Sequence, residues 1–81
     1  MEYKIKDFRN EGSNKHVGFE VTDDSGRHLF IEKDVTLSEG KTDEQYTQEA
    51  LALCQAEIDE WQLSFVNIGR IWNPNTNSFE G

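Results

Sequence analysis

The spacing of apolar residues changes once along this sequence, near residue 42, and this change constrains the fold more than any other feature. Before it, apolar and polar side chains alternate within three segments, residues 2–9, 16–22 and 27–35. A period of two is typical of strands that bury one face. After it, apolar side chains recur every three or four positions, the period of an amphipathic helix. We therefore expect three strands followed by one helix.

The segments between the expected strands are short and rich in turn-forming residues. Residues 10–15 centre on Gly12. Residues 23–26, Asp-Asp-Ser-Gly, form a tight-turn sequence in which Gly26 supplies a positive φ. Because short turns join antiparallel neighbours, the three strands are expected to form an antiparallel β-meander.

Two of the expected strands carry irregularities. Phe8 interrupts the alternation of the first strand, which predicts a bulge or a strand end at that point. In the third strand, Leu29 and Ile31 lie on one side and Phe30 on the other. Apolar groups on both faces favour a central position for this strand in the sheet.

The start of the helix is the clearest local signal. Thr42 and Gln45 have the spacing of a capping box, in which each side chain bonds the backbone N–H of the other residue. Asp43 and Glu44 in the first turn complement the positive end of the helix dipole. We place the helix at residues 42–63. Its apolar stripe comprises Tyr46, Ala50, Leu53, Cys54, Ile58, Trp61 and, at the end, Phe65.

The C-terminal stretch changes period again. Residues 65–72 are expected to form a strand in which Gly69 marks a bulge or a close approach. Residues 73–77, Asn-Pro-Asn-Thr-Asn, predict a turn, and residues 78–80 a short return strand. Two arrangements stay open, since residues 65–81 either join the main sheet or project from it as an arm.

These elements define an α+β fold with the order β-β-β-α-β-β: an antiparallel β-meander packed against one amphipathic α-helix, then a C-terminal strand or hairpin. The 81 residues are enough for a single small domain, 1–81. Leu, Ile, Val and Phe make up 19 of the 81 residues. Highly charged chains stay disordered when this share falls below roughly one-fifth, and here it is higher. So small a domain buries little surface, and its stability is expected to be marginal unless a partner adds buried area.

The charge and the apolar runs argue against several classes of partner. The net charge is −8 and the isoelectric point about 4.5, which disfavours nucleic acid and anionic membrane surfaces. No apolar run approaches the roughly 18 residues of a membrane span. The polar segment after Met1 predicts no signal peptide, and the lone Cys54 suits a reducing compartment or a particle component.

Candidate catalytic chemistry is sparse. A nucleophilic pair would require His16 or His28 beside Cys54, but Cys54 falls on the apolar stripe and is expected to be a buried structural residue. Two histidines and one cysteine also match no zinc-ligand spacing. We therefore predict a protein that is not an enzyme, with no catalytic residue, no cofactor and no metal.

The expected helix is acidic. Residues 43–60 hold six carboxylates and no lysine or arginine. Such a face either keeps the protein soluble or binds a basic partner, and Glu44, Asp59 and Glu60 are the candidate contacts. Mimicry of DNA is a less favoured interpretation, because duplex DNA carries one charge per roughly 1.7 Å of its axis and this helix offers far fewer charges.

Two aromatic residues flank the C-terminal turn. Trp72 and Phe79 either stack across a hairpin or form an exposed patch that binds a protein partner, since tryptophan is a common interface anchor. A small core makes a partner contact at these residues a credible hypothesis.

Three stretches carry a resemblance to known proteins: residues 23–26, Asp-Asp-Ser-Gly, residues 39–44, Glu-Gly-Lys-Thr-Asp-Glu, and residues 72–77, Trp-Asn-Pro-Asn-Thr-Asn. In their order and spacing they resemble small proteins of tailed bacteriophages. The resemblance implies a virion structural component or a small accessory factor, and it carries no functional residue across. It also implies a location in a virion or in a host cytoplasm. We predict a phage-type structural or assembly protein that acts through protein–protein contacts or self-association. The alternative is a small acidic regulatory binder or inhibitor of a host protein.

Overall fold

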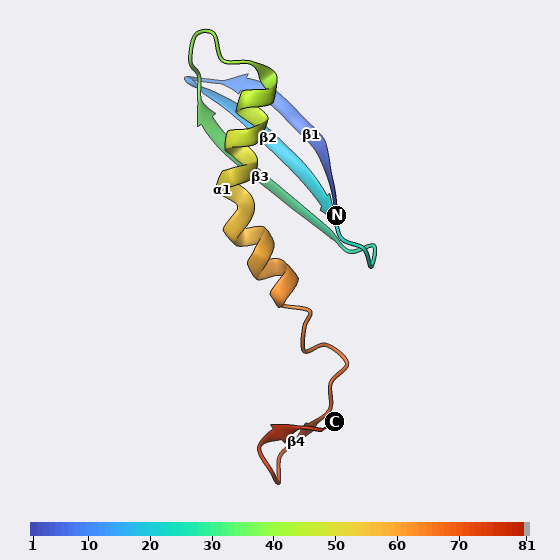
Figure 1. Ribbon diagram of the computed structural model, residues 1–81. Coiled ribbons are helices and arrows are strands. Elements are labelled where there is room, and N and C mark those ends of the chain that lie inside the picture. The colour runs from blue at the N-terminus through green and yellow to red at the C-terminus, as the bar shows by residue number, and fades with distance from the viewer. Residues whose placement is uncertain (81) are drawn as a thin grey trace.

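The computed structural model describes residues 1–80 and confirms the predicted β-β-β-α-β-β order (Figure 1). The first three strands, β1 (Glu2–Glu11), β2 (Asn14–Thr22) and β3 (His28–Thr36), form an antiparallel sheet. The helix α1 (Asp43–Leu63) follows, and then the short strands β4 (Trp72–Asn73) and β5 (Ser78–Phe79). The expected meander, helix and terminal hairpin are therefore all present.

The sheet order is β1-β2-β3, so the central strand is β2 and the prediction that the third strand is central was wrong. In a meander of three strands the second one must lie between its two hairpin partners. Phe30, whose apolar ring suggested a central strand, instead lies exposed on the face opposite the helix. The expected bulge is present slightly before Phe8, where the β1–β2 register shifts between Ile5 and Asp7.

The turn between β2 and β3 forms as its sequence predicts. The Asp23 carboxylate accepts hydrogen bonds from the backbone N–H groups of Ser25 and Arg27, each at 2.9 Å. Gly26 has a φ of +82°, the left-handed conformation that glycine adopts without strain. This turn fixes the register in which Thr22 pairs with His28.

The helix begins at the predicted capping box. The Gln45 backbone N–H donates to Thr42 Oγ1 at 3.2 Å, and the Thr42 backbone N–H donates to Gln45 Oε1 at 2.8 Å. The Tyr46 hydroxyl then ties the preceding loop to the helix, because it donates to the Ser38 carbonyl oxygen and accepts from the Ser38 N–H, both at 3.0 Å. The loop that reverses the chain is thus held at its helical end.

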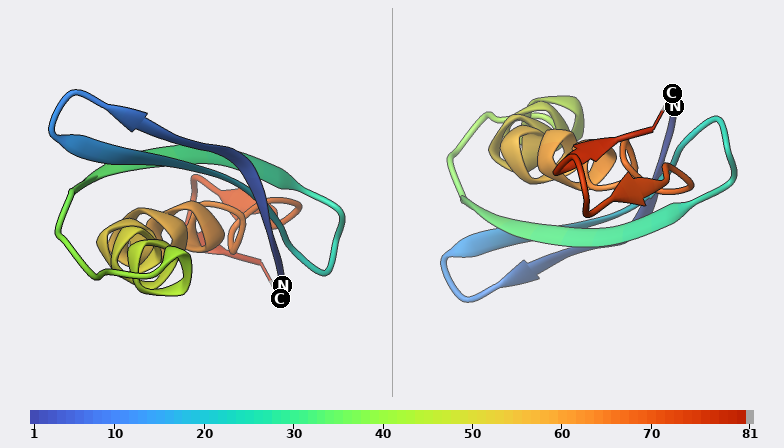
Figure 2. Two further views of the ribbon diagram at one scale, coloured as in Figure 1. Left: turned by 90° about the horizontal axis from the view of Figure 1, so that it is seen from above. Right: turned by 90° about the horizontal axis from the view of Figure 1, so that it is seen from below.

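The core lies between α1 and one face of the sheet, here called the inner face (Figure 2). The helix packs on β3 and to a lesser extent on β2. Its backbone does not come close to β1, although Phe8 of β1 packs against the core. The opposite, outer face of the sheet carries no other element (Figure 2). Among the described residues, 1–80, eight side chains are buried: Val17, Phe19, Val21, Val35, Tyr46, Ala50, Cys54 and Ile58.

The segment after the helix does not extend the main sheet. Residues 64–80, which we call the arm, leave the end of α1 and finish in the separate β4–β5 hairpin (Figure 1). The sequence left open whether this segment joins the main sheet or projects from it, and in the structure it projects. Gly81, the last residue of that prediction, lies outside the described residues. The molecule measures 61 × 21 × 16 Å, with a radius of gyration of 17.7 Å. A compact domain of this length would have a radius near ~12 Å.

The expected strand at residues 65–72 was wrong except at its last residue. Backbone N–H groups of Phe65, Val66 and Ile68 donate to carbonyl oxygens three residues earlier, which makes a series of turns. Gly69 is a turn glycine with a φ of +90° and open space around it, neither a bulge nor a close approach. An apolar run without a neighbouring strand cannot form a ladder, so local turn bonds satisfy its backbone.

Within residues 1–80, no helix is long and apolar enough to cross a membrane.

Candidate interaction surface

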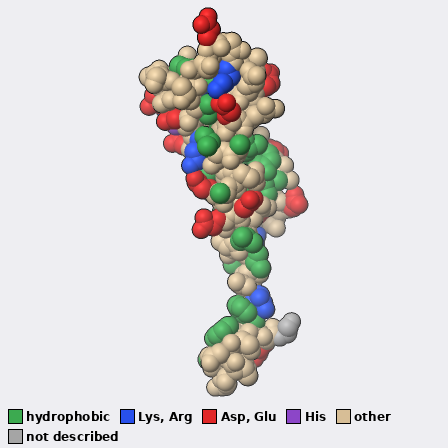
Figure 3. All heavy atoms as spheres, turned by 60° about the vertical axis from the view of Figure 1, so that its left-hand side comes forward, with side chains coloured by type: hydrophobic (Ala, Val, Ile, Leu, Met, Phe, Trp, Pro, Cys, Tyr) green, Lys and Arg blue, Asp and Glu red, His purple; other side chains and the backbone are tan. Residues whose placement is uncertain are grey.

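Exposed apolar side chains run along the arm and the helix end that leads into it. Figure 3 shows hydrophobic side chains along the narrow stem below the helix and on the terminal hairpin. Each is between 37% and 68% exposed. Monomeric proteins leave single apolar residues on the surface, but a contiguous series of them indicates an interaction site. The members are Leu63, Val66, Ile68, Ile71, Trp72 and Phe79.

The structure brings the two predicted aromatic contacts, Trp72 and Phe79, together on the hairpin. Their ring centroids are 5.1 Å apart with an edge-to-face angle of 80°. The Arg70 guanidinium lies over the Phe79 ring, 3.8 Å from its centroid. The two rings therefore stack across the hairpin, as the first of the two predicted arrangements has it. About half of Trp72 nevertheless stays exposed, so it remains available to a protein partner, as the second arrangement requires.

The hairpin has little to hold it besides this stack. Its strands pair through only two residues each, and neither strand contacts the sheet or the helix. The Asn73 side chain supports the turn by accepting a hydrogen bond from the Asn75 N–H at 2.9 Å. An isolated two-stranded hairpin is marginally stable in water. Additional burial against another surface would stabilise the arm.

A second apolar surface lies on the inner face of β1. Tyr3 and Ile5 pair with Val21 and Phe19 of β2, which are buried beneath the helix. Because α1 does not reach β1, Tyr3 and Ile5 themselves are 40% and 43% exposed. We call this pair the β1 shelf. The alternation of Tyr3 and Ile5 with polar residues is visible in the sequence. The sequence did not predict that the helix would leave the shelf uncovered, because the position of the helix depends on tertiary packing.

The acidic candidates do not converge on one surface. Glu44 and Asp59 lie 15 residues apart on the helix, which corresponds to about 22 Å along its axis. Glu60 instead borders a shallow hollow beside Leu29 and Trp61. Among residues 1–80 none of these three carboxylates forms an ion pair. Two other helix carboxylates are paired with lysines, since Glu49 binds Lys41 and Glu57 binds Lys33.

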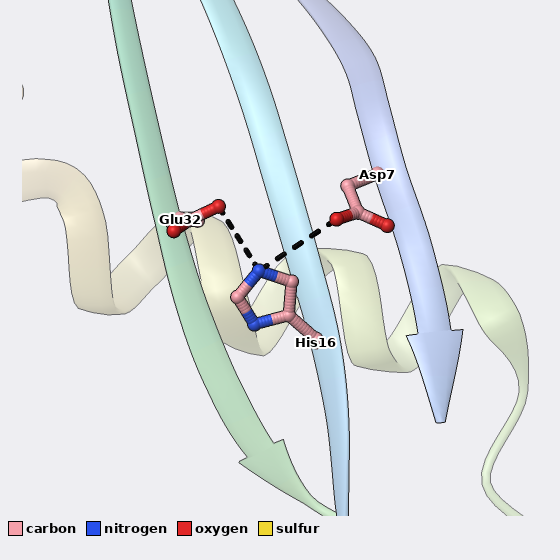
Figure 4. A group of neighbouring side chains, drawn as sticks. All are labelled: Asp7, His16 and Glu32. Atoms are coloured by element: carbon pink, nitrogen blue, oxygen red, sulfur yellow. Dashed lines mark hydrogen bonds and ion pairs between the residues drawn. The ribbon is translucent and has the colours of Figure 1, made fainter. Parts of the chain in front are cut away.

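The outer face of the sheet carries a histidine among carboxylates that sequence reasoning missed (Figure 4). His16 Nδ1 lies 2.7 Å from Asp34 Oδ1 and Nε2 lies 3.0 Å from Glu32 Oε2, while Asp7 Oδ2 is 3.8 Å away. Hydrogen bonds to Asp34 and Glu32 raise the pKa of His16. Both ring nitrogens face acceptors, so the protonated ring, with two N–H donors, fits best.

This cluster could have been predicted from the pairing of β2 with β3. The turn that pairs Thr22 with His28 also places His16 opposite Asp34. Asp7, His16 and Glu32 each offer one possible metal ligand, and these atoms lie within 4.8 Å of one another. The hydrogen bonds to a protonated ring account for the arrangement.

The candidate nucleophilic pair does not form. Cys54 is buried between helix and sheet, and burial raises the pKa of its thiol. His16 and His28 both lie on the outer face, with His28 Nδ1 3.0 Å from Thr22 Oγ1. Because the sheet separates these histidines from Cys54, neither acts as its base. The prediction that Cys54 is a buried residue is confirmed.

Comparison of the chain with protein-family models, with curated proteins and with solved structures finds no match.

Proposed function

We propose that this protein is a non-enzymatic structural or assembly component that acts through protein–protein contacts of its arm, including self-association. The observation that carries the proposal is the row of exposed apolar side chains on an arm that has no core of its own. Burying one such side chain completely contributes roughly 1.5–3 kcal/mol. Phe65, at the start of the arm, packs on Trp61 of the helix and under Arg27 of the β2–β3 turn. The exposed apolar residues beyond it contribute nothing to the core of the sheet and helix, so their apolar character is best explained by a contact with another subunit.

The resemblance to small proteins of tailed bacteriophages supplies the proposed setting. The protein would act in a virion or in the cytoplasm of an infected host, and the arm would pack into a larger particle. Residues of the arm, with Trp72 and Phe79 at its end, would be the partner-binding residues. The stacked pair presents a rigid aromatic anchor at low entropic cost, as interface hot spots do.

The test is the substitution Trp72→Ala, with Asn75→Ala at the tip of the same hairpin as the control. Because Trp72 contacts neither sheet nor helix, its loss should shift the monomer melting temperature by less than about 4 °C. Loss of a hot-spot tryptophan should raise the dissociation constant of the assembly by about thirty-fold. Circular dichroism measures the melting temperature, and sedimentation equilibrium measures the dissociation constant. Unchanged association in Trp72→Ala would refute the proposal.

The second candidate is an acidic regulatory binder or inhibitor of a host protein. It is favoured by the absence, within residues 1–80, of ion pairs at Glu44, Asp59 and Glu60. DNA mimicry has less support, because duplex DNA carries one charge per roughly 1.7 Å and this helix offers far fewer charges along its length.

This alternative predicts binding to a basic host protein that weakens as salt is added. Reversing Glu44, Asp59 and Glu60 to lysine should abolish that binding. The same reversal at three exposed carboxylates outside the helix, Glu2, Glu39 and Glu80, is the matched control. Equal loss in both triple variants would show that only net charge matters and would rule out a specific acidic face.

A further inference from the structure

We propose that the partner of the arm is a second copy of this chain, and that each arm packs on the β1 shelf of the other copy in a reciprocal two-fold dimer. The inference rests on the proposed function, since it names the partner and the acceptor surface for the same arm. Both surfaces are apolar, both are uncovered, and one chain carries one of each. In a two-fold dimer, the arm of each copy contacts the shelf of the other, so the same contact forms twice.

The shape of the molecule brings the two surfaces together. The arm projects beyond the end of the helix, away from the sheet of its own chain (Figure 1). In an antiparallel pair of elongated molecules, each arm therefore runs beside the sheet of the other copy. The β1 shelf is accessible from that side because α1 packs over β3 and β2.

The helix flank beside the shelf carries mostly uncharged side chains. Glu57 forms an ion pair with Lys33 of β3 and so marks the β3 side of the helix. At 3.6 residues per turn, Leu51, Gln55 and Gln62 lie about 120–160° around the helix from Glu57, on the flank toward β1. The same arc also holds Glu44, at the start of the helix. Asp59 lies just beyond the arc and accepts a hydrogen bond from Gln55 at 2.9 Å, so an arm seated on the shelf would meet mostly, but not only, uncharged helix side chains.

Charge also favours this pairing among the possible contacts. The net charge of −8 makes two copies repel one another at most surfaces. Strand β1 has three acidic and three basic residues, and the arm has one of each, Glu80 and Arg70. Both segments are thus neutral, and the excess negative charge lies in the rest of the chain. Within residues 1–80, seven of the eleven exposed large apolar side chains lie in these two neutral segments, and the other four are Met1, Phe30, Leu53 and Leu63.

The area is sufficient for a stable dimer. Eight large apolar side chains per copy, six along the arm and helix end and two on the shelf, are between about one-third and two-thirds exposed. Each would bury roughly 40–80 Å² of apolar surface. Both copies together then bury about 640–1,300 Å² of apolar area, and interfaces are only roughly three-fifths apolar. The total reaches the roughly 1,200–2,000 Å² of specific interfaces.

The test uses one charged substitution on each surface. Ile5→Lys changes the shelf, and Glu2→Gln on the outer face of the same strand is its control with the same change in charge. Ile71→Glu changes the arm, and Asn75→Glu at the hairpin tip is its control. Sedimentation equilibrium of the full chain should show dissociation constants raised about thirty-fold or more by Ile5→Lys and Ile71→Glu, and within about threefold of wild type in both controls.

Mixing the two variants then tests whether arm and shelf meet. A dimer of one Ile5→Lys copy and one Ile71→Glu copy keeps one native arm–shelf contact and gains opposite charges at the other. It should therefore form at least about tenfold more tightly than either variant alone. An arm that packs on another arm would gain nothing from this mixture, and that result would overturn the inference.

The outcomes separate the inference from the proposed function. If Ile71→Glu dissociates the wild-type assembly and Ile5→Lys does not, the arm still mediates association but the shelf is not its acceptor. If the wild-type protein is monomeric at every concentration, self-association fails and the inference falls with it. Where Ile5→Lys lowers the melting temperature of the monomer, Tyr3→Lys on the same shelf replaces it.

Discussion

The substitution Ile58→Ala tests whether stability resides in the helix–sheet layer alone. Ile58 is fully buried and is the largest fully buried side chain of the core. Replacing such an isoleucine by alanine costs about 2–5 kcal/mol, which combines lost transfer energy with the cavity left behind. A domain of about 80 residues has only about 4–12 kcal/mol in total. We therefore expect Ile58→Ala to remove a large share of the stability and to lower the melting temperature by at least about 10 °C.

Leu53→Ala is the matched control on the same helix, five residues earlier. Leu53 lies on the predicted apolar stripe but is 56% exposed, so its truncation should cost less than about 1 kcal/mol. Urea unfolding followed by circular dichroism measures both variants, at a protein concentration low enough to keep the chain monomeric. Equal destabilisation by the two substitutions would refute the assignment of the core.

Three further predictions concern the cap, the pH dependence and the salt dependence. Thr42→Ala removes the acceptor for the Gln45 N–H and should cost about 1 kcal/mol in urea unfolding, whereas Thr42→Ser should cost far less. Hydrogen bonds to Asp34 and Glu32 raise the pKa of His16 above its unfolded value near ~6.5, so the stability they contribute is fully present below about pH 6.5 and lost as pH rises through the raised pKa. His16→Gln should abolish this part of the pH dependence, and an NMR titration that places the His16 pKa at or below ~6.5 would contradict the cause. Salt should strengthen self-association by screening the repulsion between copies of charge −8, and self-association that weakens as salt is added would contradict a contact between uncharged, apolar surfaces.

Local signals in the sequence were sufficient for the meander and the helix. The capping box at Thr42 and the turn at Gly26 each have their partners within a few residues, so local chemistry determines them. The same holds for the Trp72–Phe79 stack, because the intervening turn brings the two strands together.

Features that depend on tertiary placement were harder to predict. The apolar run at residues 65–71 has strand composition, yet it pairs with no strand of the main sheet and forms turns instead. The exposure of Tyr3 and Ile5 follows from the position of α1 over β3, which no local pattern encodes. The acidic helix face shows a related limit, since composition alone did not reveal that Glu49 and Glu57 pair with lysines from outside the helix.

The most direct test of the account is the mass of the wild-type protein in solution, measured by sedimentation equilibrium across a wide dilution series. The account predicts reversible association, with an average mass that rises from that of the 9.4 kDa monomer to that of a dimer. A single 9.4 kDa species at every concentration and salt would contradict self-association through the arm.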